Sequence, residues 1–290
     1  MKVRRIKGEG MSGIAIVTDS ASCIPAELVR QYNIHIIPFH LAWDRQVFRD
    51  GVDISAAEFY NRLRQNDMRP TTSQPSVGEL AALYESLSDV ADGIVSIHIP
   101  REISNTCQSA EYAAQHFSRV PTRVIDSRTA TIAQGFVVLA AARVAAAGGT
   151  LDEVVAAAEA TIPRVGLYAT LSSLEPLRRG GRIGEAIRLV GARLSVYPVL
   201  YLAEGRVRVA TVTRARHKAL ERIVELVAQQ VGDQPVRASV FHGDDPETAE
   251  RLAADVQARF SCVEFYITEF TPVMGAHTGP GVIGVAYCIV

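Results

Sequence analysis

The chain of 290 residues is poor in cysteine and carries almost no net charge. Its four cysteines lie far apart, which excludes the paired spacing of a zinc site or a redox dithiol: Cys23, Cys107, Cys262 and Cys288. The seven histidines show no metal-ligand spacing either, so we expect no metal site. The 30 Lys and Arg residues against 31 Asp and Glu residues give a formal net charge of −1. This balance provides no general attraction to nucleic acid or to an anionic membrane.

Long hydrophobic runs are absent as well. The longest, residues 135–147, contains Arg143 and is too short to cross ~30 Å of hydrocarbon. The basic first ten residues lack the apolar stretch of a signal peptide, and we expect residues 1–13 to be an N-terminal extension with Met11 as a candidate start. With 48% hydrophobic residues and no enrichment in Gly or Pro, the chain is expected to be globular and cytoplasmic, with one large or two smaller domains.

The first half of the sequence alternates between short apolar runs and helix signals. Four runs are predicted to be buried strands: residues 14–18, 34–38, 93–100 and 122–126. Ser55 and Ser76 each precede a glutamate by three residues, the pattern of a capping box at a helix start. The alternation predicts an N-terminal α/β domain, residues 14–163, whose parallel sheet carries helices on both faces.

The second half, residues 164–290, has a different pattern. Ala203-Glu204-Gly205 separates two strand-like runs, residues 195–202 and 206–212, and so predicts a hairpin. A long helix is expected over residues 214–231, and Asp245-Pro246 is typical of the start of another. Further strands are expected over residues 236–242, 263–270 and 282–290, the last two closing the sheet. The pattern predicts a C-terminal α/β domain with a mixed or antiparallel sheet, joined to the first domain by the helical residues 151–164.

Three predicted loops place hydroxyl groups near strand ends or helix starts. They are Asp19-Ser20, residues 71–76 with Thr72 and Ser73, and residues 104–106 with Ser104. Ligands of an open parallel sheet bind outside the carboxyl ends of its strands, and hydroxyls beside helix N-termini suit a carboxylate or a phosphate. The simpler interpretation of each loop alone is that its Ser and Thr residues cap helices.

Two glycine-containing segments offer further polar groups. Residues 177–184 place glycines beside Arg182, and residues 275–281 form a predicted glycine-rich loop that contains His277 and Thr278. Each has an ordinary interpretation, a solvated arginine and a loop histidine. The glycines of residues 279–284 match a dinucleotide fingerprint, but too few residues follow them for a βαβ unit. There is no P-loop lysine motif and no nucleophile elbow, so these patterns indicate an anion site whose chemistry stays open.

Six of these segments, in this order, resemble the DegV family, which includes the fatty-acid-binding subunits (FakB) of bacterial fatty acid kinase. They are VTDSAS, TSQPS, IPREISNTCQSA, VIDS, LRRGGRIG and GAHTGPGVIG, and they cover the chain from Ile14 almost to its end. The resemblance implies a two-domain α/β fold with a long-chain fatty acid, such as palmitate, in a tunnel between the domains.

The resemblance also implies which residues bind the acid. Its carboxylate would be held by Thr72 and Ser104, with Arg182 and His277 completing the network around it. Ser73 and Thr278 are lesser candidates. This sequence has Asn105 where the family often has glycine, and asparagine tolerates a left-handed backbone better than other residues do.

By the same resemblance, the protein is a lipid-binding carrier without catalytic residues or a cofactor. It would present the carboxylate to a separate fatty acid kinase subunit, which forms an acyl-phosphate used in phospholipid synthesis. A basic segment, residues 213–218, matches one that the family has before its long helix, and it is a candidate contact for an acidic partner or a phosphate.

One alternative is a small-molecule phosphotransferase or hydrolase that uses His277, because the second domain is similar to dihydroxyacetone kinases. The lack of a nucleotide-binding motif counts against it. A purely structural interaction protein is a third interpretation, which would leave the clustered polar residues unexplained.

Overall fold

The computed structural model describes residues 13–65, 69–182 and 196–290. The predicted N-terminal extension therefore lies outside the described residues except for Gly13. Three further residues named by the sequence patterns also lie outside them: Ile183, Gly184 and Ser195.

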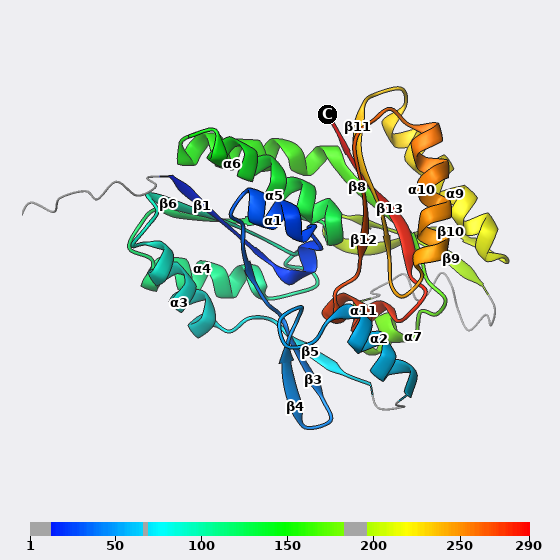
Figure 1. Ribbon diagram of the computed structural model, residues 1–290, viewed down its shortest axis with the longest axis horizontal. Helices are drawn as coiled ribbons and strands as arrows, with labels where there is room; N and C mark the ends of the chain where they lie inside the picture. The colour runs from blue at the N-terminus through cyan, green and yellow to red at the C-terminus, as the bar shows by residue number, and fades with distance from the viewer. Residues whose placement is uncertain (1–12, 66–68, 183–195) are drawn as a thin grey trace, which may run out of the picture.

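A parallel sheet of four strands forms one half of the molecule, in the order β2-β1-β6-β7. Its strands are β1 (Ile14–Asp19), β2 (His35–Ile37), β6 (Gly93–His98) and β7 (Thr122–Asp126). The helices of this half are α1 (Ala26–Gln31), α3 (Val77–Leu87), α4 (Thr106–Phe117), α5 (Thr131–Ala146) and α6 (Leu151–Thr161). Helices α3 and α4 cover one face and α5 and α6 the other (Figure 1). The predicted parallel sheet with two covered faces is confirmed, and Ser76 and Glu79 form the predicted capping box of α3.

A mixed sheet of six strands forms the other half, in the order β10-β9-β8-β13-β11-β12. Its strands are β8 (Val165–Thr170), β9 (Tyr197–Ala203), β10 (Arg206–Thr213), β11 (Val236–His242), β12 (Cys262–Glu269) and β13 (Ile283–Ile289). Helices α9 (Arg216–Val231) and α10 (Pro246–Arg259) pack on its outer face. The predicted hairpin, mixed sheet and helix starting at Asp245-Pro246 are confirmed. The expectation that the last strand closes the sheet is wrong, because β13 pairs with both β8 and β11 and so lies in its interior.

Helix α5 joins the two halves by packing against both large sheets. Its residues are mostly apolar and mostly buried, as expected of a helix that packs between two sheets. The successive layers are thus α3 and α4, the parallel sheet, α5 and α6, the mixed sheet, and α9 and α10 (Figure 1). The domain division predicted after residue 163 falls in the short helix η2 (Ile162–Arg164) and stays a prediction.

A third sheet, which the sequence patterns did not predict, projects below the two halves in Figure 1. It contains β3 (His40–Trp43), β4 (Gln46–Arg49) and β5 (Thr71–Ser73), and α2 (Ala56–Gln65) lies between β4 and β5 in sequence. Both strand pairs are antiparallel. Residues 71–73, expected to be a loop, are therefore a strand. Three residues carry too little periodicity to reveal a strand whose partner lies about thirty positions away.

Two short helices lie between these sheets: α7 (Glu175–Arg179) and α11 (Pro272–Thr278). The prediction that residues 275–281 form a loop is wrong for the residues up to Thr278, because Pro272 begins a helix that contains them. Helix α11 packs against α2, α7, β3 and β5 and against η1 (Ser20–Ser22). None of the helices within the described ranges has the length and apolar character needed to cross a membrane.

Candidate functional site

A cavity of about 150 Å³ lies where the three sheets approach one another. Its wall is mostly apolar and includes Phe39, Ile99, Leu167, Leu200, Phe241 and Phe270. Phe241 and Phe270 stack with their ring centroids 5.1 Å apart, which gives one side of the wall a flat aromatic surface. The cavity is therefore suited to an apolar group.

Polar side chains from four separate segments reach this apolar wall. All six residues predicted to bind a ligand line the cavity: Thr72, Ser73, Ser104, Arg182, His277 and Thr278. The structure thus brings together residues that are far apart in the sequence, such as Thr72 and His277, which are 205 positions apart. Their role in binding stays a prediction, whereas their proximity is a property of the fold.

Thr72 and His277 form a direct hydrogen bond in this cavity, with 2.7 Å between Thr72 Oγ1 and His277 Nε2. Thr72 is held by β5, where it pairs with Leu41, and His277 by the last turn of α11. Burial and, to a smaller extent, the positive charge of Arg182 lower the pKa of His277 to about 4. The imidazole is therefore neutral at pH 7 and has one N–H donor and one acceptor nitrogen.

Gly180 lets α7 approach the histidine closely. A Cβ atom at this position would lie 2.5 Å from His277 Nδ1, far inside van der Waals contact. The backbone of Gly180 is in the ordinary right-handed region, so this position needs glycine for space and not for conformation. Gly180, the first glycine of the GG pair in the sequence motif, thus lies directly against the His277 imidazole.

Ser104 lies in a turn between β6 and α4, and its amide donates to the carbonyl of Pro100 over 3.0 Å. Its hydroxyl shares a hydrogen bond of 2.7 Å with Thr106 Oγ1 and also accepts from the amide of Thr106. The intervening Asn105 has φ −83°, so it does not use the left-handed backbone for which asparagine was considered suitable. The turn places the Ser104 hydroxyl at the N-terminus of α4, where a negative charge is favoured.

Arg182 connects α7 to this same turn. Its guanidinium donates to the carbonyl of Ile103 over 3.3 Å and also to the carbonyl of Gly180. Gly181, with φ +70°, supplies the left-handed residue that turns the chain back after α7. Thr278 is less suited to bind a ligand, because its hydroxyl already donates to the carbonyl of Met274 over 3.0 Å. Ser73 lines the cavity but is largely exposed.

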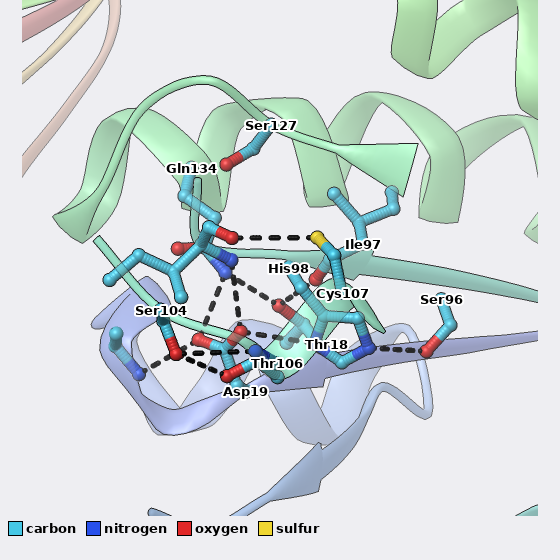
Figure 2. Close-up of polar contacts among 12 residues, drawn as sticks. Thr18, Asp19, Ser96, Ile97, His98, Ser104, Thr106, Cys107, Ser127 and Gln134 are labelled. Atoms are coloured by element: carbon cyan, nitrogen blue, oxygen red, sulfur yellow. Dashed lines mark hydrogen bonds and ion pairs between the residues drawn. The ribbon is translucent and has the colours of Figure 1, made fainter. Parts of the chain in front are cut away.

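A buried polar network, which the sequence patterns did not reveal, supports two of these loops (Figure 2). Asp19 is fully buried at the end of β1, and its carboxylate accepts from four groups: His98 Nδ1, the amides of Ala21 and Ile99, and the Gln134 amide. The Asp19–His98 distance is 3.0 Å. Asp19 therefore fixes both η1 and the start of the turn that carries Ser104.

The same network continues from His98 to Ser96 and Tyr84. His98 Nε2 lies 2.7 Å from Ser96 Oγ, and the Tyr84 hydroxyl donates to Ser96 over 2.8 Å. Serine, histidine and aspartate together suggest a hydrolytic triad. Ser96, however, is fully buried inside β6 and is not among the described residues that line the cavity, so the arrangement supports structure and does not present a nucleophile. Only the pairing of β1 with β6 brings Asp19 and His98 together, and no sequence spacing signals it.

The site as a whole offers hydrogen-bond donors to an anionic or polar group next to an apolar wall. The donors are the Ser104 hydroxyl, the Arg182 guanidinium and one donor of the Thr72–His277 pair, because the other donor of that pair forms their mutual hydrogen bond. No group of three or more His, Cys, Asp or Glu residues is arranged to hold a metal ion in the part of the chain that the structure describes.

Comparison with known proteins finds one family over nearly the whole chain. The family model described as "Uncharacterised protein, DegV family" matches residues 13–290. The DegV domain-containing protein SCO2569 of Streptomyces coelicolor is 38% identical over 275 residues, which are 94% of this chain and 97% of the relative.

Solved structures show the same fold. The crystal structure of DegV, a fatty acid binding protein from Bacillus subtilis, has a TM-score of 0.90 at 33% identity and covers 97% of this chain and 100% of that chain. A DegV family protein from Thermus thermophilus, whose structure is reported for its fatty acid binding, has a TM-score of 0.90 at 32% identity, with coverages of 96% and 100%. The predicted α/β architecture is therefore confirmed by comparison as well as by its own topology.

Proposed function

The chain belongs to the DegV family, and from this premise we propose that it binds a long-chain fatty acid in the cavity. The observation that carries the proposal is the meeting of Thr72, Ser104, Arg182 and His277 on an otherwise apolar wall. The fatty acid binding reported for the Bacillus and Thermus structures supports it.

The physical chemistry of the site favours such a ligand. A carboxylate that leaves water must regain hydrogen bonds, and Ser104, Arg182 and the remaining donor of the Thr72–His277 pair supply them. The positive guanidinium of Arg182 adds electrostatic attraction that a neutral polar ligand would not use. An acyl chain gains ~0.8 kcal/mol for each methylene group transferred into an apolar cavity, so a chain as long as palmitate is held without covalent chemistry.

The proposed role is that of a carrier which presents the carboxylate to a separate fatty acid kinase subunit for acyl-phosphate formation. The basic segment at residues 213–218 is the proposed contact. Arg214, His217 and Lys218 are exposed, and Arg216 is bound to Asp245 and to the carbonyl of Gly281, just after the helix that carries His277. The carrier has two domains divided after residue 163, with the ligand between them, and acts in the cytoplasm.

Mass spectrometry of the purified protein, native and after organic extraction, tests the proposal. We expect one fatty acid per chain, and Thr72→Val should weaken palmitate binding by about tenfold or more, since a hydrogen bond to a charged group is lost. Thr71→Val is the matched control, because Thr71 is exposed on the same strand and is not among the described residues that line the cavity. An empty protein that also fails to take up palmitate would overturn the proposal and favour the small-molecule enzyme that uses His277.

A further inference from the structure

Asp50 is a buried carboxylate that reaches the beginning of α11 from a distant part of the chain. It follows β4 directly and is only 2% exposed. Its Oδ1 accepts a hydrogen bond of 2.9 Å from the amide of Val273, the second residue of α11. Thr271 is the N-cap residue of α11, but its side chain makes no capping hydrogen bond within the described structure. The carboxylate of Asp50 thus satisfies an amide that the helix geometry leaves without an intrahelical partner.

The same residue is tied to the strands that carry Thr72. The amide of Asp50 donates to the carbonyl of Phe39 over 2.8 Å, and the amide of Phe39 donates to Ser20 Oγ over 3.1 Å. Phe39 leads directly into β3, whose Leu41 pairs with Thr72 on β5. Asp50 therefore lies where the three-stranded sheet, η1 and α11 meet.

We propose that Asp50 is a positioning residue that holds His277 of α11 in register with Thr72 of β5. The Thr72–His277 hydrogen bond joins two elements that are far apart in the sequence. At 2.7 Å, this hydrogen bond tolerates a displacement of only a few tenths of an ångström before it weakens. Helix α11 is short and continuous, so a shift of its first turn moves His277 in its last. The significance of this for ligand binding rests on the proposed function.

The surroundings of Asp50 agree with a fixed, specific contact. Burial raises the pKa of Asp50 to about 6, and the hydrogen bond from the Val273 amide opposes that rise. The titratable groups that act on it are Asp19 and Cys23 near η1, and Tyr60 of α2. No cation is among the groups acting on Asp50 in the described structure, so the carboxylate is retained here without a salt bridge. The hydrogen bond that the Asp50 side chain accepts from the Val273 amide therefore links this buried carboxyl group to α11.

The test uses Asp50→Ala, Asp50→Asn and the control Asp53→Ala in the full chain. Asp53 carries the same charge in the same segment but is bonded to Arg49 at the surface. Two quantities are measured: the pKa of His277 in the ligand-free protein, by NMR with 15N-labelled histidine, and the affinity for palmitate.

We expect Asp50→Ala to raise the pKa of His277 from about 4 toward 6.5, since a loosened α11 exposes the imidazole. Palmitate affinity should fall by about tenfold or more. Asp50→Asn keeps an acceptor oxygen for the Val273 amide and should retain both properties, as should Asp53→Ala. A folded Asp50→Ala protein with an unchanged His277 pKa and unchanged palmitate affinity would overturn the proposal.

If Asp50→Ala does not fold, Asp50→Glu and Asp50→Asn decide the question. Positioning requires an acceptor at the reach of aspartate, so the asparagine variant should bind palmitate better than the longer glutamate does. The reverse order would show that negative charge matters and would refute positioning. If the wild-type protein does not bind palmitate, the proposed function fails, while the His277 pKa of the ligand-free variants still tests the role of Asp50.

Discussion

Replacing Gly180 by alanine perturbs the site at one defined contact. The added Cβ would lie 2.5 Å from His277 Nδ1, whereas ordinary van der Waals contact begins near 3.4 Å. The imidazole must therefore move by about 1 Å, or α7 must move away from it. A ring displaced by about 1 Å cannot keep the 2.7 Å hydrogen bond to Thr72 in its present geometry.

We expect Gly180→Ala to destabilise the fold by about 1–3 kcal/mol, the usual range for an added methyl group in a packed interior. Palmitate affinity should fall by about tenfold or more, because one donor to the carboxylate is displaced. Gly181→Ala is the matched control. Its Cβ would meet no atom of the described residues within 4 Å, but φ +70° strains any side chain there, so it should destabilise by about 1 kcal/mol and leave affinity intact.

Thermal unfolding and isothermal titration with palmitate separate these effects. The prediction concerns the pair of variants, so neither value alone decides it. If Gly180→Ala binds palmitate as tightly as the wild-type protein does, the position of His277 is irrelevant to binding. If Gly181→Ala loses affinity to the same extent, general destabilisation explains the loss, and the steric argument fails.

Two further predictions concern buried ionisable side chains. The pKa of His277 is about 4 in the folded protein and 6.5 ordinarily, so protonation of this residue in the unfolded chain should lower the free energy of unfolding by up to about 3 kcal/mol as pH falls from 6.5 to 4. Asp50, whose pKa burial raises to about 6, acts in the opposite direction over the same range, so the effect of His277 is the difference between two proteins in denaturant titrations: the wild-type protein should lose up to about 3 kcal/mol more than His277→Gln. Parallel curves would contradict the assignment. Asp19→Ala should destabilise the fold by about 3–5 kcal/mol, since it leaves four buried donors without their acceptor. The control Asp89→Ala breaks an exposed ion pair with Arg119 and should change stability by less than about 1 kcal/mol. Equal losses of stability in urea denaturation would refute the role given to the buried network.

The sequence predicts the large elements because their signals are local. Four apolar runs give the parallel strands, and the Ser76–Glu79 capping box gives the start of α3. It does not predict the three-stranded sheet, because β5 is three residues long and its stability comes from pairing with β3. The sequence does not predict the turn between β3 and β4 either, because Asp44 and Arg45 adopt positive φ without the glycine that usually marks such a turn.

The candidate site divides in the same way. Family resemblance singles out Thr72, Ser104, Arg182 and His277, and all four line one cavity. The sequence gives no sign of Asp19 or Asp50 as supports, because each acts on residues that are close only in the folded chain: His98 is 79 positions from Asp19, and Val273 is 223 positions from Asp50. Such contacts have no spacing rule that a single sequence can show.

The two buried carboxylates have complementary places in the architecture. Asp19 secures η1 and the turn that carries Ser104 to the parallel sheet, while Asp50 secures α11 and His277 to the three-stranded sheet. Phe39, whose amide donates to Ser20 and whose carbonyl accepts from Asp50, lies between the two systems. Ser104 and His277 therefore belong to separate elements, yet the segment that carries each is held by a carboxyl group that does not line the cavity in the described structure. This arrangement lets the cavity wall stay apolar for the proposed acyl chain while the polar groups at the site keep a fixed geometry.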